Sequence, residues 1–333
     1  MEIVQRNIRA CKLGTPDYAE IEASVAVADF EKRIHVYESN YETMDAESTQ
    51  GCERVRSWIK IIDCRQFVMN NIRGYIPSRL VQFLSHLHMQ PHSFYFTRHG
   101  ESEYNQLGKI GGDSGLSPAG DRYAKCLAKF AESTICVDAA TGDKVAARLW
   151  TSTMRRTRET ARYITHYKTS IAYTGDDTGG RLQEWIQLRP RAWSNLDELF
   201  AGSCDGMTYL EIEQHYPEEF NRRQRDKLAY RYPRGESYLD MIHRLDAMIM
   251  EMERHREPLL VIAHQGILRL LYAYYMGLSR EEAPYVSIPL NTVIHLQPQV
   301  YSCNEQRHRL CEKITTDGQD EPLPHVDLDP PSH

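Results

Sequence analysis

The sequence has no apolar run long enough to cross a membrane, no closely spaced cysteine pair and no GxxxxGK[ST] loop of the kind that binds nucleotide phosphates. A spanning helix needs roughly 18 consecutive apolar residues, and the N-terminus at Met1–Ala10 has no apolar core, so neither a membrane segment nor a secretion signal is predicted. The eight cysteines lack metal-ligand spacing. These absences predict a cytoplasmic protein with reduced, structural thiols and no metal site.

Excess charge is also scarce outside the C-terminal tail. The 333 residues carry a formal net charge of −6, and the tail 312–333 holds six acidic side chains against one lysine, so the remainder is close to −1. A nearly neutral body lacks the basic face that duplex binding needs, and no nucleic-acid partner is expected. The tail has four prolines and few large apolar residues, a composition that predicts disorder.

Short apolar segments that end at polar or glycine-containing sequence predict three strands, over 93–97, 148–151 and 259–263. A helix is predicted over 116–130, with Ser117 as its N-cap and Pro118 at its first position. A second helix is predicted over 236–255, where apolar residues recur at helical spacing. Strands that alternate with helices are typical of α/β proteins.

Residues 1–90 read as a separate unit that ends in a helical run from Asn70 to His88. Met89, Gln90 and Pro91 mark the best boundary, because proline tends to end a helix and a strand begins immediately afterwards. The sequence therefore predicts three parts, namely 1–90, 91–311 and 312–333.

Candidate phosphate ligands follow all three strands. Arg98 and His99 come after the first, Arg156 after the second and His264 after the third. In a parallel sheet the carboxyl ends of the strands share one edge, where open α/β sheets bind their ligands. An imidazole can attack phosphorus while guanidinium groups neutralise the charge on the oxygens. The pattern predicts a phosphoryl-transfer site that needs no metal.

Seven motifs occur in one order: RHGESEYN, KIGGDSGLS, LWTSTMRRTRETA, LDELFAGSCDGMTYLEI, EQHYPEEF, RYPRGESY and VIAHQGILR. In this order the chain resembles the histidine phosphatase superfamily. It is most similar to the bisphosphatase half of the 6-phosphofructo-2-kinase/fructose-2,6-bisphosphatase family, over residues 93 to about 303. The resemblance implies a three-layer α/β/α sandwich and hydrolysis of fructose 2,6-bisphosphate, a sugar bisphosphate whose level controls glycolysis.

The resemblance also implies roles for individual residues. His99 would take the 2-phosphoryl group, Arg98, Arg156 and His264 would hold its oxygens, and Asn105 and Gly111 would contact the substrate. A sugar oxygen leaves poorly without a proton, so a carboxylic acid is required. Glu198 is the preferred acid by its ungapped match to the family motif. Glu184 is the competing candidate, because the region 173–194 looks longer than in relatives.

A second phosphate needs another cationic patch, and the family pattern implies six residues for it: Tyr209, Arg223, Lys227, Tyr238, Gln265 and Arg269. Arg223 and Lys227 are four apart and would share one helical face, where like charges repel unless an anion lies between them. In the alternative interpretation, Arg222, Arg223, Arg225 and Lys227 form a solvated basic run that pairs with Glu218 and Glu219.

Residues 1–90 resemble the end of the kinase half of the same bifunctional family, with Lys12, Arg33 and Tyr37 at positions associated with nucleotide or fructose 6-phosphate. The phosphate-binding loop is missing, so ATP and magnesium belong to a part that this sequence lacks, and no kinase activity is predicted. A partial α/β half would expose former interior surface, which predicts a homodimer or a partner that covers residues 1–90.

Two other functions stay open at this stage. A phosphoglycerate mutase or a broad sugar-phosphate phosphatase would use the same fold. A non-catalytic protein that senses sugar phosphates would belong to a different class, although Arg98, His99, Arg156 and His264 are all in place.

Overall fold

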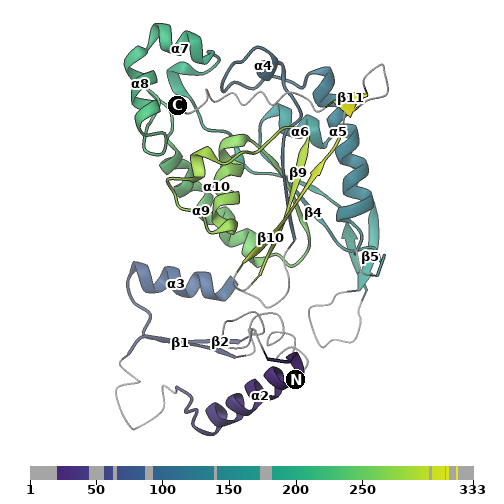
Figure 1. Cartoon of the computed structure of the whole chain (residues 1–333), viewed down its shortest axis with the longest axis vertical. Coiled ribbons are helices and arrows are strands. Elements are labelled where there is room, and N and C mark those ends of the chain that lie inside the picture. The colour runs from purple at the N-terminus through teal and green to yellow at the C-terminus, as the bar shows by residue number, and fades with distance from the viewer. Residues whose placement is uncertain are drawn as a thin grey trace. The chain divides into compact units, whose positions relative to one another are not determined.

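The computed structural model describes residues 21–44, 56–62, 66–86, 93–138, 141–172, 182–299, 302–311, 313–314 and 320–321 (Figure 1). The chain divides into two compact units, one formed by residues 1–89 with 299–302 and the other by residues 90–298 with 303–333. The predicted boundary at Met89–Pro91 lies outside the described residues.

The described part of the N-terminal unit contains two helices and a β-hairpin: α2 (Ala23–Ser39), β1 (Trp58–Ile62), β2 (Gln66–Asn70) and α3 (Tyr75–His86). The predicted start of the last helix at Asn70 is wrong, because Asn70 ends β2, where it pairs with Trp58. The chain then turns through Asn71 and Gly74, whose φ angles are 50° and 90°. Backbone in the left-handed region cannot continue a right-handed helix, so α3 begins only at Tyr75.

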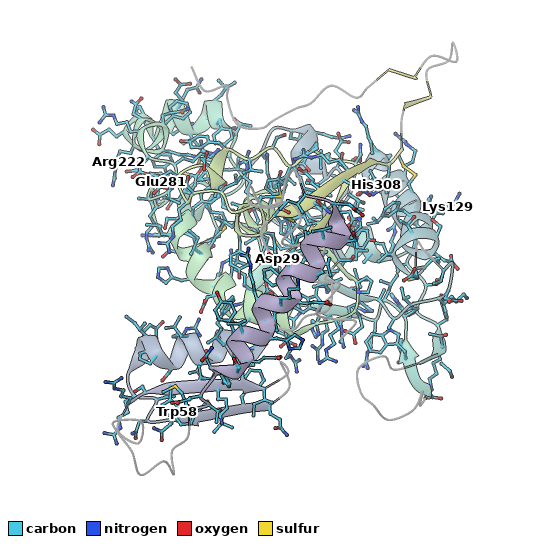
Figure 2. All side chains as sticks on the ribbon, turned by 60° about the horizontal axis from the view of Figure 1, so that its bottom comes forward. Asp29, Trp58, Lys129, Arg222, Glu281 and His308 are labelled. Carbon is cyan, nitrogen blue, oxygen red and sulfur yellow. A yellow bond between two sulfur atoms is a disulfide. The ribbon has the colours of Figure 1, made fainter. Side chains whose placement is uncertain are left out.

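Little of the described part of this unit is buried. Among its described residues only Ala26 and Trp58 are buried in the apolar core, and α3 buries none of its side chains. Figure 2 labels Asp29 on α2 and Trp58 on the hairpin. The exposed large apolar side chains of the unit are Ile21, Val25, Val36, Tyr37, Tyr41, Met44, Ile61, Ile62, Val68, Met69, Tyr75, Ile76 and Leu80.

The larger unit begins with β3 (Phe94–Arg98), α4 (Glu103–Gln106), α5 (Pro118–Phe130), the π-helical η3 (Ala131–Ile135), β4 (Arg148–Thr151), α6 (Arg155–Ala161), β5 (Lys168–Ala172), β6 (Leu182–Ile186) and β7 (Pro190–Ala192). It continues with η4 (Ser194–Leu196), η5 (Gly202–Cys204), α7 (Tyr209–His215), α8 (Pro217–Arg225), α9 (Tyr238–Arg254), β8 (Leu259–Ala263), α10 (Gln265–Met276), η6 (Ala283–Tyr285), β9 (Thr292–Pro298) and β10 (Cys303–Arg309).

A six-stranded sheet in the order β10-β9-β3-β8-β4-β7 forms the centre of this unit. The three predicted strands are confirmed as β3, β4 and β8, and they are parallel neighbours, with β8 in the middle. β9 and β10 add an antiparallel edge. The parallel arrangement brings the carboxyl ends of β3, β8 and β4 to one edge, as the sequence predicted.

Alternate residues of the strands bury their side chains on opposite faces of the sheet. Phe94, Phe96 and Val261 pack on one face in the cluster that includes α9 and α10. Tyr95 and Leu260 pack on the other face, against α5 and α6. A period of two along each strand requires this division. The predicted three-layer α/β/α architecture is therefore present.

The two predicted helices are also confirmed. α5 begins at Pro118, and the Ser117 hydroxyl caps it by accepting a hydrogen bond from the Gly120 amide. α9 begins at Tyr238 after a capping box in which Ser237 and Asp240 exchange hydrogen bonds. Both caps satisfy amides that the first helical turn leaves unpaired.

The prediction that all the cysteines are reduced is wrong for one pair. Cys126 on α5 and Cys311 after β10 form a disulfide, whereas Cys136, Cys204 and Cys303 are free. The spacing rule missed this pair, because 185 residues separate the two positions in the sequence. Of the tail, β11 (Lys313–Ile314) and β12 (Asp320–Glu321) form a short antiparallel pair. The predicted disorder of the remaining tail concerns residues outside the described ones.

Candidate active site

His99 follows β3 directly, and its backbone amide still donates to the Ala263 carbonyl of β8. The side chain is 4% exposed. Nδ1 lies 2.7 Å from the Gly100 carbonyl oxygen. Because a carbonyl can only accept, Nδ1 must carry the ring proton, which leaves the Nε2 lone pair available.

Arg156 faces that lone pair. It extends from the first turn of α6, just after β4, and its Nε donates to His99 Nε2 at 3.1 Å. Its second branch donates to the Gly112 carbonyl at 2.7 Å. Burial, and then the positive charges of Arg156 and Arg98, hold the pKa of His99 well below its usual value. His99 is therefore neutral near pH 7, as a nucleophile must be.

Arg98 is the last residue of β3 and is also 4% exposed. Its guanidinium donates to the Ile288 carbonyl at 3.1 Å. This backbone anchor fixes one branch of the guanidinium while the residue lines the cleft beside His99. Both predicted arginines thus carry their charge next to the nucleophile.

His264 follows β8 and is completely buried. Its ring centroid lies 5.1 Å from that of His99, and its Nε2 lies 2.7 Å from the Ser152 hydroxyl after β4. Within the described residues Nδ1 has no hydrogen-bond partner. Burial, followed by the charge of Arg156, lowers the pKa of His264 well below its usual value. His264 is not itself among the residues that line the cleft. An anion bound beside its ring would offset the charge of Arg156.

Glu198 lies in the loop that follows η4 and lines the same cleft. Its carboxylate accepts from the Leu199 amide at 2.9 Å and from the Gly266 amide at 3.2 Å. Glu184 is on β6, where it is exposed and 3.7 Å from Lys168. Because β5 and β6 form a separate hairpin, Glu184 does not line the cleft. Of the two candidate acids, only Glu198 lines the cleft together with His99.

The cleft is also lined by the residues predicted for a second phosphate, and the part of it that they form is called its far end: Tyr209, Arg223, Lys227, Tyr238, Gln265 and Arg269. Arg223 donates to the Tyr209 hydroxyl at 3.0 Å and stacks over its ring. The Lys227 ammonium lies 5.1 Å from the centroid of the Tyr285 ring. Arg269 donates to the Val286 carbonyl at 2.7 Å and to the Tyr238 hydroxyl at 3.4 Å.

One detail of that prediction is wrong. Arg223 and Lys227 do not share a helical face, because α8 ends at Arg225 and Lys227 lies in the turn that follows. The alternative of a wholly solvated basic run is also incorrect. Arg222 is exposed and pairs with Glu219, and Figure 2 shows it on α8 at the outer surface. Lys227, in contrast, is only 8% exposed.

Gly111 and Asn105, the latter on α4, also line the cleft. Gly111 has a φ of 68°, and a Cβ there would lie 1.8 Å from a carboxylate oxygen of Asp205. Glycine is therefore required for both the backbone angle and the space. Asp205 in turn accepts from the Gly112 amide at 3.0 Å. The Asn105 side-chain oxygen accepts from Ser102, so its amide nitrogen is the group left for a ligand.

The three residues predicted from the kinase resemblance do not meet at a described site. Lys12 lies outside the described residues. Arg33 is exposed on α2, where it pairs with Asp29 at 2.9 Å. Tyr37 is 73% exposed on the same helix.

Sequence reasoning missed several residues that line or support the cleft. Lys109 and Tyr104 line it, with the ammonium 5.7 Å from the ring centroid. Tyr230 and Tyr232 line it as well, and Ser152 holds His264. Lys109 is the first residue of the KIGGDSGLS motif, Tyr230 directly precedes RYPRGESY, and Tyr232 is part of it. The motifs therefore marked these segments, but the sequence did not show which of their side chains face the cleft.

Comparison with known proteins places this site in a family. Residues 94–309 match the model of the histidine phosphatase superfamily (branch 1), so the chain belongs to that superfamily. Residues 1–91 match the model described as 6-phosphofructo-2-kinase. The fold agrees with a solved structure, the α-ribazole phosphatase from Shigella flexneri, at a TM-score of 0.50 and 18% identity, covering 65% of this chain and 96% of that one.

Two curated relatives show the more specific resemblance. The chain is 42% identical to 6-phosphofructo-2-kinase/fructose-2,6-bisphosphatase 3 of Rattus norvegicus, over 94% of its own length and 51% of the relative's. It is 40% identical to 6-phosphofructo-2-kinase/fructose-2,6-bisphosphatase 4 of the same organism, over 99% of its length and 63% of the relative's. The predicted resemblance to this bifunctional family is confirmed, and the chain spans about half to two thirds of these relatives.

Neither a membrane helix nor a metal cluster occurs in the described part of the chain. None of its helices has the length and apolar composition that a membrane crossing needs. No group of three or more His, Cys, Asp or Glu side chains there is arranged to hold a metal ion.

Proposed function

We propose that the chain hydrolyses fructose 2,6-bisphosphate to fructose 6-phosphate and phosphate through a phosphohistidine at His99. The observation that carries the proposal is the unprotonated Nε2 of His99, which faces Arg156 in a cleft whose other end holds a second set of cations. A bisphosphate has one charged group for each end. The names of the curated relatives support this choice of substrate.

The residues perform the reaction in two steps. In the first, His99 Nε2 bonds to the 2-phosphorus, the bond from phosphorus to the sugar oxygen breaks, and Glu198 gives that oxygen a proton. Arg98, Arg156 and the unpaired Nδ1 of His264 stabilise the phosphoryl oxygens. In the second step, water gives a proton back to Glu198 and attacks phosphorus, which releases inorganic phosphate and restores His99.

The far end of the cleft selects the substrate by binding the 6-phosphate. Arg223, Lys227 and Arg269 each bring a positive charge, and the tyrosine hydroxyls add neutral donors. Arginine suits this task because its planar fork matches phosphate oxygens.

The decisive experiment measures phosphate release from fructose 2,6-bisphosphate in EDTA, together with acid-labile label on the protein after addition of 2-[³²P] substrate. Wild-type protein should release phosphate and take up label, and the His99→Ala variant should do neither. Release without label, or label that survives the substitution, would contradict the phosphohistidine. Transfer of the label to a second hydroxyl would favour a mutase, and folded protein that binds the sugar without turnover would favour a sensor.

Three further properties complete the proposal. The phosphatase needs no metal or other cofactor, which the EDTA experiment tests, and the chain has no kinase activity, which ATP-dependent formation of fructose 2,6-bisphosphate would refute. A homodimer or partner covers the N-terminal unit, whose apolar side chains are exposed, and light scattering with and without residues 1–90 tests the dimer. The proposed location is the cytoplasm, and the Cys126–Cys311 disulfide is unusual for it, because cytosolic thiols are mostly reduced.

A further inference from the structure

In the described structure, the carboxylate of Glu198 accepts hydrogen bonds only from backbone amides, those of Leu199 and Gly266. No side chain fixes it directly. Its position therefore depends on the backbone of its own loop, residues 194–200, which has only the short turn η4 as regular structure. A loop that carries a proton donor must be held in place by other elements.

One arginine from α9 holds that backbone. The Arg244 guanidinium donates to the carbonyls of three loop residues: Asn195 at 2.5 Å, Asp197 at 2.7 Å and Glu198 at 3.3 Å. In return, the side-chain amide nitrogen of Asn195 donates to the Arg244 carbonyl at 2.7 Å. The rigid fork of a guanidinium reaches several acceptors at once, which a lysine ammonium cannot do with the same geometry.

Glu236 links the arginine to the far side of the loop. Its carboxylate accepts from Arg244 at 3.0 and 3.2 Å, and also from the Phe200 amide at 3.0 Å. The arginine and its partner thus hold the chain before and after Glu198. Their side chains are 20% and 27% exposed, so this pair is more protected than an ordinary surface ion pair.

A third contact ties the loop to the end of the central strand β4. The Asp197 carboxylate accepts from the Thr153 amide at 2.7 Å and from its hydroxyl. The loop is therefore attached to the sheet edge through Asp197 and to α9 through Arg244. Removing the arginine would release the middle of the loop while both ends stay attached.

We infer that Arg244, with Glu236, is the positioning residue that aligns Glu198 for proton transfer to the leaving oxygen. The inference rests on the proposed function for the role of Glu198. Arg244 itself does not line the cleft, so it acts through the loop and not on the substrate.

The test compares two esters that differ in their need for a proton. The sugar oxygen of fructose 2,6-bisphosphate needs one, whereas the phenolate of 4-nitrophenyl phosphate leaves without it. Single-turnover phosphorylation of the protein is measured for wild type, Arg244→Lys, Glu198→Gln and the double variant. Arg244→Lys should slow phosphorylation by the sugar ester roughly tenfold and change the aryl ester less than about twofold.

The double variant supplies the second readout. If Arg244 acts through Glu198, its substitution costs nothing further once Glu198→Gln is present. Arg254→Lys is the matched control, because Arg254 is on the same helix but pairs with Glu251 at the surface. An equal loss for both esters, or additive losses in the double variant, would overturn the inference and make Arg244 a general structural residue.

Failure of the proposed function gives a different result. Wild-type protein that cleaves aryl esters but not fructose 2,6-bisphosphate would refute the substrate alone. The same comparison would then run between phenyl and 4-nitrophenyl phosphate, and a selective loss on the phenyl ester would still support the role of Arg244. Absence of turnover with every ester would refute both.

Discussion

The two ends of the cleft are held by different kinds of contact. At the His99 end, the side chains come from the ends of β3 and β8 and from the start of α6 after β4, and backbone carbonyls and a serine hydroxyl fix them. At the Tyr209 end, the cations come from α8, the turn after it and α10, and aromatic rings accompany two of them. Under the proposed function, the ends of the sheet strands would hold the reacting phosphoryl group, and α8, the turn after it and α10 would select the substrate.

This difference predicts which substitutions affect every phosphate ester and which affect only bisphosphates. A change at the sheet end alters the stabilisation of the transferring phosphoryl group, which all substrates share. A change at the other end alters binding of a group that only some substrates have.

Arg156→Lys should have the largest effect. Lysine cannot contact both His99 and the Gly112 carbonyl in the same fork, and loss of one such donor costs about 10²–10³-fold in kcat. The loss should appear with sugar and aryl phosphates alike, in steady-state assays. Arg155→Lys is the control, since the neighbouring Arg155 is 62% exposed and pairs with Glu159. A fall in kcat confined to bisphosphates would contradict the expectation that the His99 end of the cleft serves all phosphate esters alike.

Gly266→Ala should come second. A Cβ at this position would lie 2.6 Å from Oε1 of Glu198, so the carboxylate must move. Displacement of a catalytic group by about 1 Å can cost about 10²-fold in rate. The fall in kcat should concern sugar phosphates, and thermal melting should show a folded protein. Unchanged kcat would mean that Glu198 is not the proton donor.

Lys227→Ala should affect the other end only. Loss of a charge-assisted hydrogen bond costs about 1.5–3 kcal/mol, which corresponds to a rise of at least about tenfold in KM for fructose 2,6-bisphosphate. KM for an aryl monophosphate should stay the same. Arg222→Ala is the matched control, because Arg222 is exposed and pairs with Glu219. Equal effects on both substrates would show that Lys227 serves the chemistry as well.

His255→Gln should have the smallest effect, and it tests stability outside the cleft. Burial, and then the charge of Arg148, lower the pKa of His255 from 6.5 to about 4. The unfolded chain therefore binds a proton that the folded chain excludes, and stability falls as the pH drops from about 6.5 toward 4. In urea titrations at several pH values, the free energy of unfolding of the variant should depend less steeply on pH between about 4 and 6.5. The slope should fall by up to the contribution of about one proton. An unchanged slope would refute the assignment.

The sequence located the sheet end of the site better than the other end. His99, Arg156 and His264 follow strands that the apolar pattern predicts to within a residue, and parallel pairing then brings them together. Only the family pattern indicated Arg223 and Lys227 as site residues, and both line the cleft. Helical spacing misjudged their geometry, because nothing in the spacing shows that α8 ends at Arg225.

Contacts between distant residues were beyond sequence reasoning. Ser152 and His264 are 112 residues apart, and Asn195 and Arg244 are 49 apart. Such pairs form only when strands and helices have packed, so no local sequence pattern predicts them. The predicted start of α3 was wrong for a different reason. Asn71 has a φ of 50°, and this left-handed backbone conformation prevents the helix from starting earlier.

The bond between Cys126 and Cys311 closes a covalent ring that includes β4, β8, β9, the Glu198 loop and the cleft residues Arg156, Arg223 and Arg269. β3 and His99 precede this ring in the sequence. A chain cut once inside this ring stays a single covalent molecule until the bond is reduced. Oxidised protein nicked by a protease in the ring would migrate as one species in a denaturing gel, and a thiol reagent would split it into two.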